Sequence, residues 1–154
     1  VMVDLNFADI VSDVAELYEP AAEEAGMTLV LAENAPALVH GNRELLGQAI
    51  ANLVDNAVKY GRRPGEEAGE PIILSTRIRD AQVELTVADH GVGIPADQRE
   101  RVLQRFVRLE ESRALPGSGL GLALVAAITQ LHEGTISISD NGPGTKAVLS
   151  LPLR

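Results

Sequence analysis

The sequence lacks cysteine and tryptophan altogether and contains few other aromatic residues. Without cysteine, disulfides, thiolate metal sites and cysteine nucleophiles are excluded, and a reducing compartment fits. Because aromatic residues make up only 3% of the chain, the core has to be aliphatic, and few ring faces are available to stack bases. The formal net charge of −9 and the absence of a basic stripe argue further against a nucleic-acid partner.

Long apolar runs are also missing. The longest uninterrupted run, 120–128, is far shorter than the roughly 20 residues that cross a bilayer. Asp4 and Asp9 interrupt any apolar leader at the start. We therefore expect a soluble, cytoplasmic chain, which is compatible with a parent protein anchored in the inner membrane. With 45% hydrophobic residues, the 154 residues are enough for a single domain, 1–154, that buries its own core.

The apolar pattern predicts helices and strands in an irregular order. Helical spacing predicts three longer helices, at 8–25, 43–60 and 119–132. Alternating or short apolar runs predict strands at 27–31, 38–39, 72–79, 82–88, 135–139 and 146–151. Asn42 is the expected N-cap of the second helix. Strands at the end of the chain have to pair with those in the middle, which favours a two-layer α/β sandwich with helices on one face of a mixed sheet.

Two segments break this pattern. Residues 62–70 are rich in Gly, Pro and Glu and are expected to form a flexible connection between elements. Residues 95–116 show a short helical pattern around 101–106 and then lose all periodicity. We expect this second segment to be a mobile flap.

A stripe of polar residues runs along the second predicted helix. Gln48, Asn52, Asn56 and Lys59 follow one another at helical spacing and share one face. A solvated helix face is the ordinary explanation of such a stripe. Surface positions favour long charged side chains over two asparagines, however, and an amide oxygen can bind Mg²⁺, which takes few protein ligands beside phosphate oxygens and water. Lys59 would then neutralise phosphate charge.

Two glycine motifs follow. Asp89-His90-Gly91-Val92-Gly93 comes directly after a predicted strand, where a carboxylate can accept a hydrogen bond from an exocyclic amine such as that of adenine; the alternative is a tight turn with an incidental aspartate. The motif 117–122 opens a helix whose free N–H groups can hold phosphates; the alternative is a helix-entry hinge. It is not a dinucleotide fingerprint, because position 122 is leucine, and the chain has no P-loop.

In their order and spacing, these motifs resemble the ATP-binding catalytic domain of sensor histidine kinases, in the superfamily of DNA gyrase, HSP90 and MutL. The resemblance extends over 3–153 and implies a Bergerat-type sandwich with an ATP lid. The matching boxes are the asparagine box 52–60, the adenine box 89–95, the phenylalanine box 105–108, the glycine-rich lid end 117–122 and the strand-entry motif Gly144-Thr145. Two departures, Val107 for an aromatic residue and Asn42 for an aspartate, affect only lid packing and a helix cap.

The resemblance implies a site for ATP and Mg²⁺. Asp89 is expected to bind the adenine amino group, Asn56 to ligate Mg²⁺ and Arg108 to reach the γ-phosphate. Asn52 and Lys59 should lie near the phosphates, and Tyr60 beside the nucleoside. The full set expected to bind ATP is Asn52, Asn56, Lys59, Tyr60, Asp89, Gly91, Gly93, Ile94, Arg108, Gly117, Ser118, Gly119, Leu120, Gly121, Leu122 and Thr145.

Position 52 separates phosphotransfer from hydrolysis. The related ATPases carry a glutamate base there, whereas Asn52 is an amide and no useful base near neutral pH. The resemblance therefore implies transfer of the γ-phosphate to a histidine on a separate dimerisation domain, with signalling to a response regulator. His40, His90 and His132 lack the His-Glu/Asp-x-x-x-Pro setting of that acceptor. We expect an isolated, monomeric catalytic domain of a homodimeric parent, with no catalytic residue of its own and no autophosphorylation.

Three other functions remain open for this chain. One is an ATPase of the gyrase or MutL type, and another is a serine kinase of the anti-sigma-factor type; Asn52 argues against both. The third is a degenerate nucleotide-binding scaffold, which the intact Asn56, Asp89 and lid glycines disfavour.

Overall fold

The computed structural model describes residues 1–62, 65, 69–93, 97, 99 and 118–154, with the side chains of 118–120 left undescribed. The predicted flap 95–116, together with the phenylalanine box inside it, falls outside these residues apart from two isolated positions. Most of the predicted connection 62–70 falls outside them as well.

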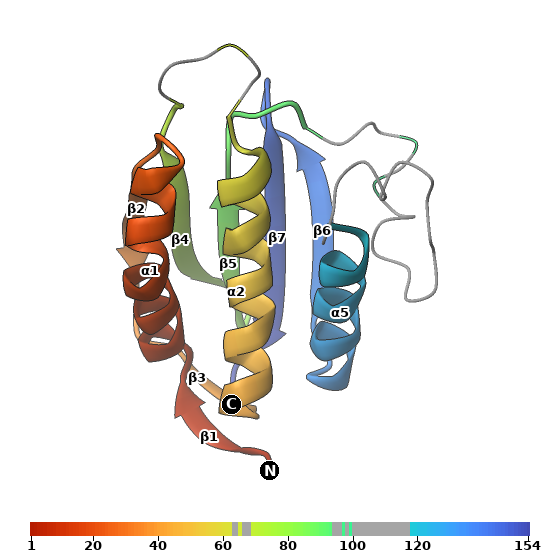
Figure 1. Ribbon diagram of the computed structural model, residues 1–154. Helices are drawn as coiled ribbons and strands as arrows, with labels where there is room; N and C mark the ends of the chain where they lie inside the picture. The colour runs from red at the N-terminus through yellow and green to blue at the C-terminus, as the bar shows by residue number, and fades with distance from the viewer. Residues whose placement is uncertain (63–64, 66–68, 94–96, 98, 100–117) are drawn as a thin grey trace.

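Three helices cover one face of a five-stranded sheet (Figure 1). The helices are α1 (Phe7–Glu24), α2 (Arg43–Tyr60) and α5 (Ser118–Leu131). The sheet has the order β2-β4-β5-β7-β6, with β2 (Leu29–Asn34), β4 (Ile72–Arg79), β5 (Gln82–Ala88), β6 (Thr135–Asp140) and β7 (Thr145–Pro152). The β2–β4 pair is parallel and the other three pairs are antiparallel. The predicted two-layer α/β sandwich with a mixed sheet is confirmed.

A second, two-stranded sheet lies below the first one in Figure 1. It pairs β1 (Val3–Asn6) with β3 (Leu38–Gly41) in antiparallel register. The sequence analysis did not predict β1, because four residues are too few to show a period. His40 lies in β3 opposite Asp4, so the strand predicted at 38–39 is two residues longer than expected. The first predicted strand is also shifted, since β2 begins two residues later than expected.

The core of the described residues is mainly aliphatic, as predicted, although it also contains the fully buried ring of Phe7. Along β5, Val83, Leu85 and Val87 are buried beneath the helices, while the residues between them are half-buried on the other face. The α2 stripe that meets them contains Leu46, Ile50 and Leu53. Each such side chain contributes about 1.5–3 kcal/mol when it is fully buried. In the described part of the chain, no helix has the length and apolar character that a membrane span requires.

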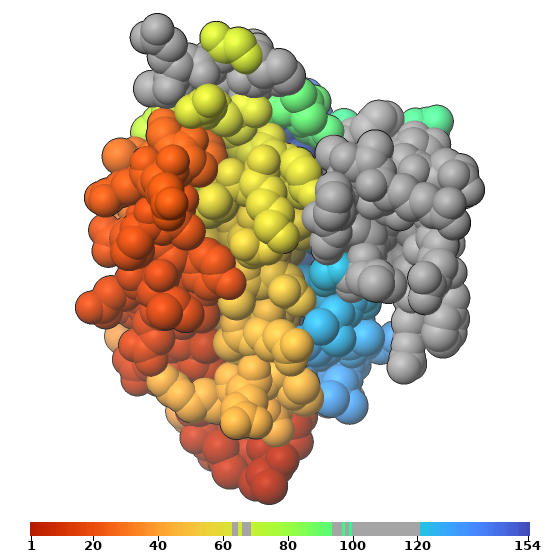
Figure 2. Space-filling model, viewed as in Figure 1, coloured from red at the N-terminus to blue at the C-terminus, as the bar shows by residue number. Residues whose placement is uncertain are grey.

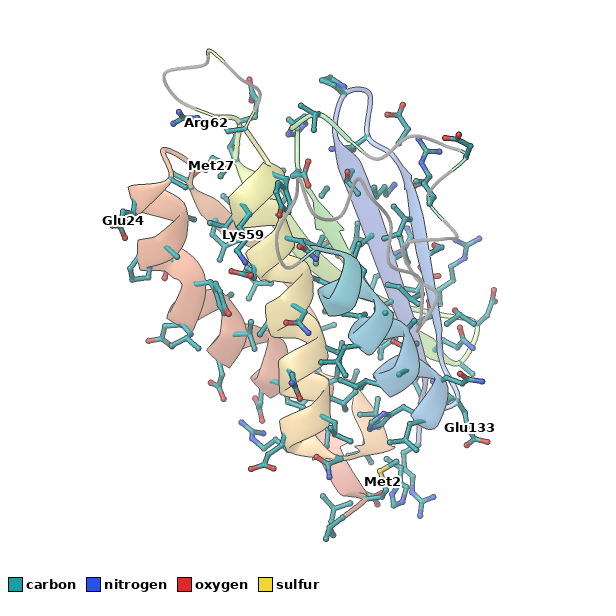
Figure 3. The ribbon with its side chains drawn as sticks, turned by 45° about the vertical axis from the view of Figure 1, so that its right-hand side comes forward. Met2, Glu24, Met27, Lys59, Arg62 and Glu133 are labelled. Carbon is teal, nitrogen blue, oxygen red and sulfur yellow. The ribbon has the colours of Figure 1, made fainter. Side chains whose placement is uncertain are left out.

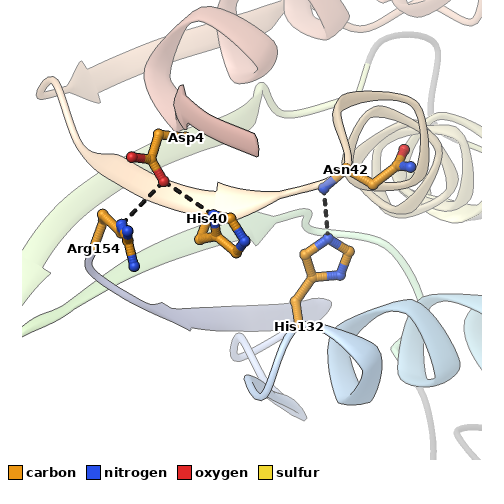
Figure 4. A network of polar contacts seen from close by, with 5 residues as sticks. All are labelled: Asp4, His40, Asn42, His132 and Arg154. Carbon is orange, nitrogen blue, oxygen red and sulfur yellow. Dashed lines mark hydrogen bonds and ion pairs between the residues drawn. The ribbon is translucent and has the colours of Figure 1, made fainter. Parts of the chain in front are cut away.

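A buried histidine joins the start of α2 to the end of α5 (Figure 4). The backbone N–H of Asn42 donates to Nε2 of His132 at 3.0 Å, and Nδ1 of the same ring donates to the Ile128 carbonyl at 2.8 Å. Both ring nitrogens are therefore used, in a neutral tautomer. A Cβ on Gly41 would lie 2.8 Å from the ring, so the close approach requires glycine there. His132 therefore has a structural role.

Asn42 also caps α2, as predicted, since its side-chain oxygen accepts from the Leu45 N–H at 3.0 Å. Replacing Asn42 by Ala leaves that N–H without its partner and should lower the free energy of unfolding by about 0.5–2 kcal/mol. Asn42→Asp keeps an acceptor oxygen and should retain most of the stability. Urea unfolding of the three proteins measures this. An alanine variant as stable as the parent would show that the cap contributes nothing.

Candidate nucleotide-binding site

Asp89 lies directly after β5 and is buried, with 7% of its surface exposed. Its Oδ1 atom accepts two backbone N–H groups, from Gly91 at 2.9 Å and from Thr145 at 3.1 Å. A carboxylate has acceptor sites on both oxygens. Among the contacts that the structure describes, Oδ2 has no such partner and is the oxygen left for a ligand.

The turn before β7 closes over this loop. The Asn141 side chain donates to the Asp89 carbonyl at 2.7 Å, and the Asp89 N–H donates to the Thr145 carbonyl at 2.9 Å. Gly144 has φ +115°, and a Cβ there would lie 2.0 Å from the Asp89 carbonyl oxygen, so the position requires glycine. The two motifs predicted to surround the base, at 89–93 and 144–145, are thus in direct contact.

The C-terminal end of α2 packs against the other side of the Asp89 loop. A Cβ on Gly91 would lie 1.8 Å from the Tyr60 carbonyl oxygen, and one on Gly61 would lie 3.2 Å from the Asp89 Cβ. Gly93 has φ +78° and approaches Gly144, whose carbonyl oxygen would lie 3.0 Å from an added Cβ. These glycines let three backbones meet with no side chain between them.

Asn56 of α2 faces the start of α5. The amide nitrogen of Asn56 lies 3.8 Å from the position that a Cβ on Gly121 would take, and both Asn52 and Asn56 are half-buried. α5 begins at Ser118 and its first N–H groups have no partner within the helix. The predicted asparagine box and the helical part of the predicted lid end therefore adjoin. Leu122 is itself buried in the core, so only its backbone is available to a ligand.

Lys59 lies on the side of α2 that faces α1 (Figure 3). Its Nζ is 2.9 Å from Oδ2 of Asp55, one helical turn earlier. This hydrogen bond raises the pKa of Lys59, so the ammonium stays charged near neutral pH. Figure 2 shows this C-terminal part of α2, in yellow, at the surface beside α1. The sequence analysis missed the pair, although an acidic residue four positions before a lysine on a helix is a recognised signal.

Burial raises the pKa of Asp89, and the backbone hydrogen bonds from Gly91 and Thr145 lower it by less. The carboxylate is therefore costly to keep charged in this buried position, and a ligand donor at its second oxygen would offset this cost. Such a site suits a neutral amine donor, and the exocyclic amine of adenine has this chemistry.

Three of the predicted ATP-binding residues, Ile94, Arg108 and Gly117, lie outside the described residues. The others gather at one end of the sheet, where β5 and α2 end and β7 and α5 begin (Figure 1). Across the described ranges, no group of three His, Asp or Glu side chains forms a metal site. A metal here would depend on an amide such as Asn56 together with phosphate oxygens. Asn141 is a further site residue that sequence reasoning missed, because the turn-forming run 141–144 did not indicate what its side chain contacts.

Comparison with known proteins agrees with this geometry. Residues 41–154 match the family described as histidine kinase-, DNA gyrase B- and HSP90-like ATPase. The sensor-like histidine kinase SenX3 of Mycobacterium tuberculosis is 38% identical over 154 residues, covering 98% of this chain and 36% of the relative. The solved structure of the mycobacterial sensor histidine kinase MprB matches with a TM-score of 0.79 and 29% identity, covering 100% of this chain and 99% of that one.

A third match is full-length ShkA in complex with AMPPNP, with a TM-score of 0.80 and 28% identity over 99% of this chain and 31% of that one. The chain belongs to the histidine kinase-, DNA gyrase B- and HSP90-like ATPase family. Within that family it corresponds to the ATPase domain of sensor histidine kinases, as the motifs predicted. It spans 36% of the length of SenX3, so the activity of full-length SenX3 is not assigned to this chain.

Asp89→Asn should abolish measurable ATP binding. The two backbone donors hold Oδ1, so the variant's amide oxygen would take that place and its NH₂ would face the adenine amino group, donor against donor. A loss of at least about 100-fold is expected in calorimetry. Asp140→Asn, which removes an exposed carboxylate at the same end of the sheet, is the matched control. Binding within a few-fold of the parent would show that Asp89 does not contact the base.

Adenosine binding should weaken as the pH falls, beginning above the range around 3.8 where an ordinary aspartate titrates, because the Asp89 pKa is raised. The contribution of Asp89 to folding stability depends on pH in the opposite way. Asp89 stabilises the folded state at pH values below the ordinary aspartate pKa, and this stabilisation is lost as the pH rises through the raised pKa of the folded protein. Adenosine carries no phosphate, so an NMR titration at several pH values isolates the base contact. An affinity that stays constant down to pH 4 would contradict the expectation.

Proposed function

We propose that this chain binds Mg-ATP and donates the γ-phosphate to a histidine on a separate dimerisation domain of a sensor kinase. The observation that carries the proposal is the buried Asp89, whose Oδ1 is held by two backbone N–H groups while Oδ2 has no such partner. This arrangement fits the exocyclic amine of adenine. The binding of AMPPNP by the related ShkA supports the same ligand class.

The phosphates of ATP would then extend from Asp89 along α2 toward the start of α5. In this proposal Asn56, near Gly121, is the amide ligand of Mg²⁺, and the N–H groups at the start of α5, which have no partner within the helix, hold phosphate oxygens. When bound, Mg²⁺ supplies charge neutralisation at the phosphates. The chain's own residues position the nucleotide, which is most of what phosphoryl transfer requires.

Transfer rather than hydrolysis follows from the residue at position 52. Asn52 is half-buried on the α2 face that carries Asn56, and its amide cannot take a proton from water. Two of the three histidines are already engaged within the domain. His132 is hydrogen-bonded on both ring nitrogens, and His40 is paired with Asp4 at 3.0 Å on the small sheet.

The partners of this reaction are the phosphoacceptor dimerisation domain and, after it, a response regulator. In this proposal the segment 1–154 is one domain, works in the cytoplasm where ATP is available, and acts within a homodimeric parent kinase. The mycobacterial relatives named as histidine kinases support this assignment.

The test is incubation with γ-labelled ATP and Mg²⁺, first alone and then with the parent's histidine-bearing dimerisation domain. Alone, the chain should bind ATP, acquire no label and release little phosphate, because it offers no nucleophile and no base. With the added domain, label should appear on that domain, lost in acid and kept in base. Label with this stability on the chain alone, or rapid phosphate release, would contradict the proposal.

A further inference from the structure

The lysine expected near the phosphates is engaged elsewhere in this structure. Lys59 pairs with Asp55 at 2.9 Å on the α1 side of α2, and the two side chains are 46% and 37% exposed. Asn56, the residue after Asp55, lies about 100° further around the helix and faces α5. The ammonium of Lys59 is therefore held by Asp55 toward α1, whereas the amide assigned to the metal faces α5.

A tyrosine from α1 borders the ion pair. Tyr18 is half-buried, and burial raises the pKa of its hydroxyl; the negative charge of Asp55 raises it further, whereas Lys59 lowers it. The phenol thus lies within electrostatic range of both charges. The Asp55–Lys59 ion pair lies beside α1 on one side and is exposed to solvent on the other.

We propose that Asp55 is a positioning residue that competes with the phosphates of ATP for Lys59 and so sets how tightly the site holds a triphosphate. The inference rests on the proposed function, which is what brings phosphates to this end of α2. A partly exposed ion pair is weak and therefore exchangeable. The lysine ammonium carries three donors on a flexible four-carbon stem, so it can turn from the carboxylate to a more highly charged phosphate.

Asp55→Asn should tighten Mg-ATP binding roughly two- to five-fold, the range expected for removing an exposed competing partner. Adenosine binding should stay unchanged, because adenosine has no phosphate for Lys59 to contact. Asp55→Glu keeps a carboxylate within reach and should bind Mg-ATP close to the parental affinity. Calorimetry with both ligands measures all three proteins.

Two further variants separate competition for Lys59 from a general charge effect. Asp13→Asn removes the same charge from another exposed ion pair, with Arg43 at 2.7 Å, and should leave the affinity for Mg-ATP as it was. In a Lys59→Met background, Asp55→Asn should no longer tighten binding, because no lysine remains to be released. The difference between the two backgrounds is the coupling free energy of the pair.

The inference is overturned if Asp55→Asn weakens Mg-ATP binding or leaves it unchanged, if adenosine responds equally, or if the gain persists in the Lys59→Met background. Any of these results would leave the proposed function standing, since the parent protein would still bind Mg-ATP and transfer phosphate. A parent protein that binds no Mg-ATP would instead overturn the proposed function, and this inference with it.

Discussion

The buried carboxylate of Asp89 holds together segments that are far apart in the sequence. Its Oδ1 atom accepts N–H groups from its own loop and from the start of β7, and its backbone is hydrogen-bonded to the turn that precedes β7. Gly91 and Gly144 let the end of α2 and that turn approach closely. The same contacts that fix the loop leave the second oxygen for a ligand. The architecture of this end of the sheet and its capacity to recognise a base therefore depend on one group.

The opposite end of the helical layer is fixed by a different polar contact. His132 connects the last turn of α5 to the first turn of α2, so the two helices are joined where the nucleotide is not expected. Toward the other end, Asn56 of α2 adjoins Gly121 of α5. A helix pair joined at one end and lined by small or polar residues at the other can hold a phosphate chain between its open ends. The aliphatic core beneath both helices keeps this spacing.

Much of this was predictable from the sequence. The three helices, the five strands of the main sheet and the cap at Asn42 follow from periodicity and local chemistry, which act within a few residues. The strand β1 could not be predicted from the sequence. Its four residues show no period, and its partner strand β3 lies more than thirty residues later in the chain. The family resemblance assigned both Asp89 and Thr145 to the nucleotide, but the hydrogen bond between them was not predicted. The Asn141 contact depends on tertiary packing, which no local pattern encodes. The Asp55–Lys59 pair has a local i, i+4 spacing and could have been predicted from the sequence.

The central claim is that Asp89 accepts a hydrogen bond from the adenine base, while α2 and the start of α5 bind the phosphates. A crystal structure of the chain with Mg²⁺ and a non-hydrolysable ATP analogue tests it most directly. The account predicts the adenine amino nitrogen within about 2.7–3.2 Å of the Asp89 carboxylate and the side-chain oxygen of Asn56 about 2.0–2.1 Å from Mg²⁺. A nucleotide bound elsewhere, or one whose base points away from Asp89, would contradict it.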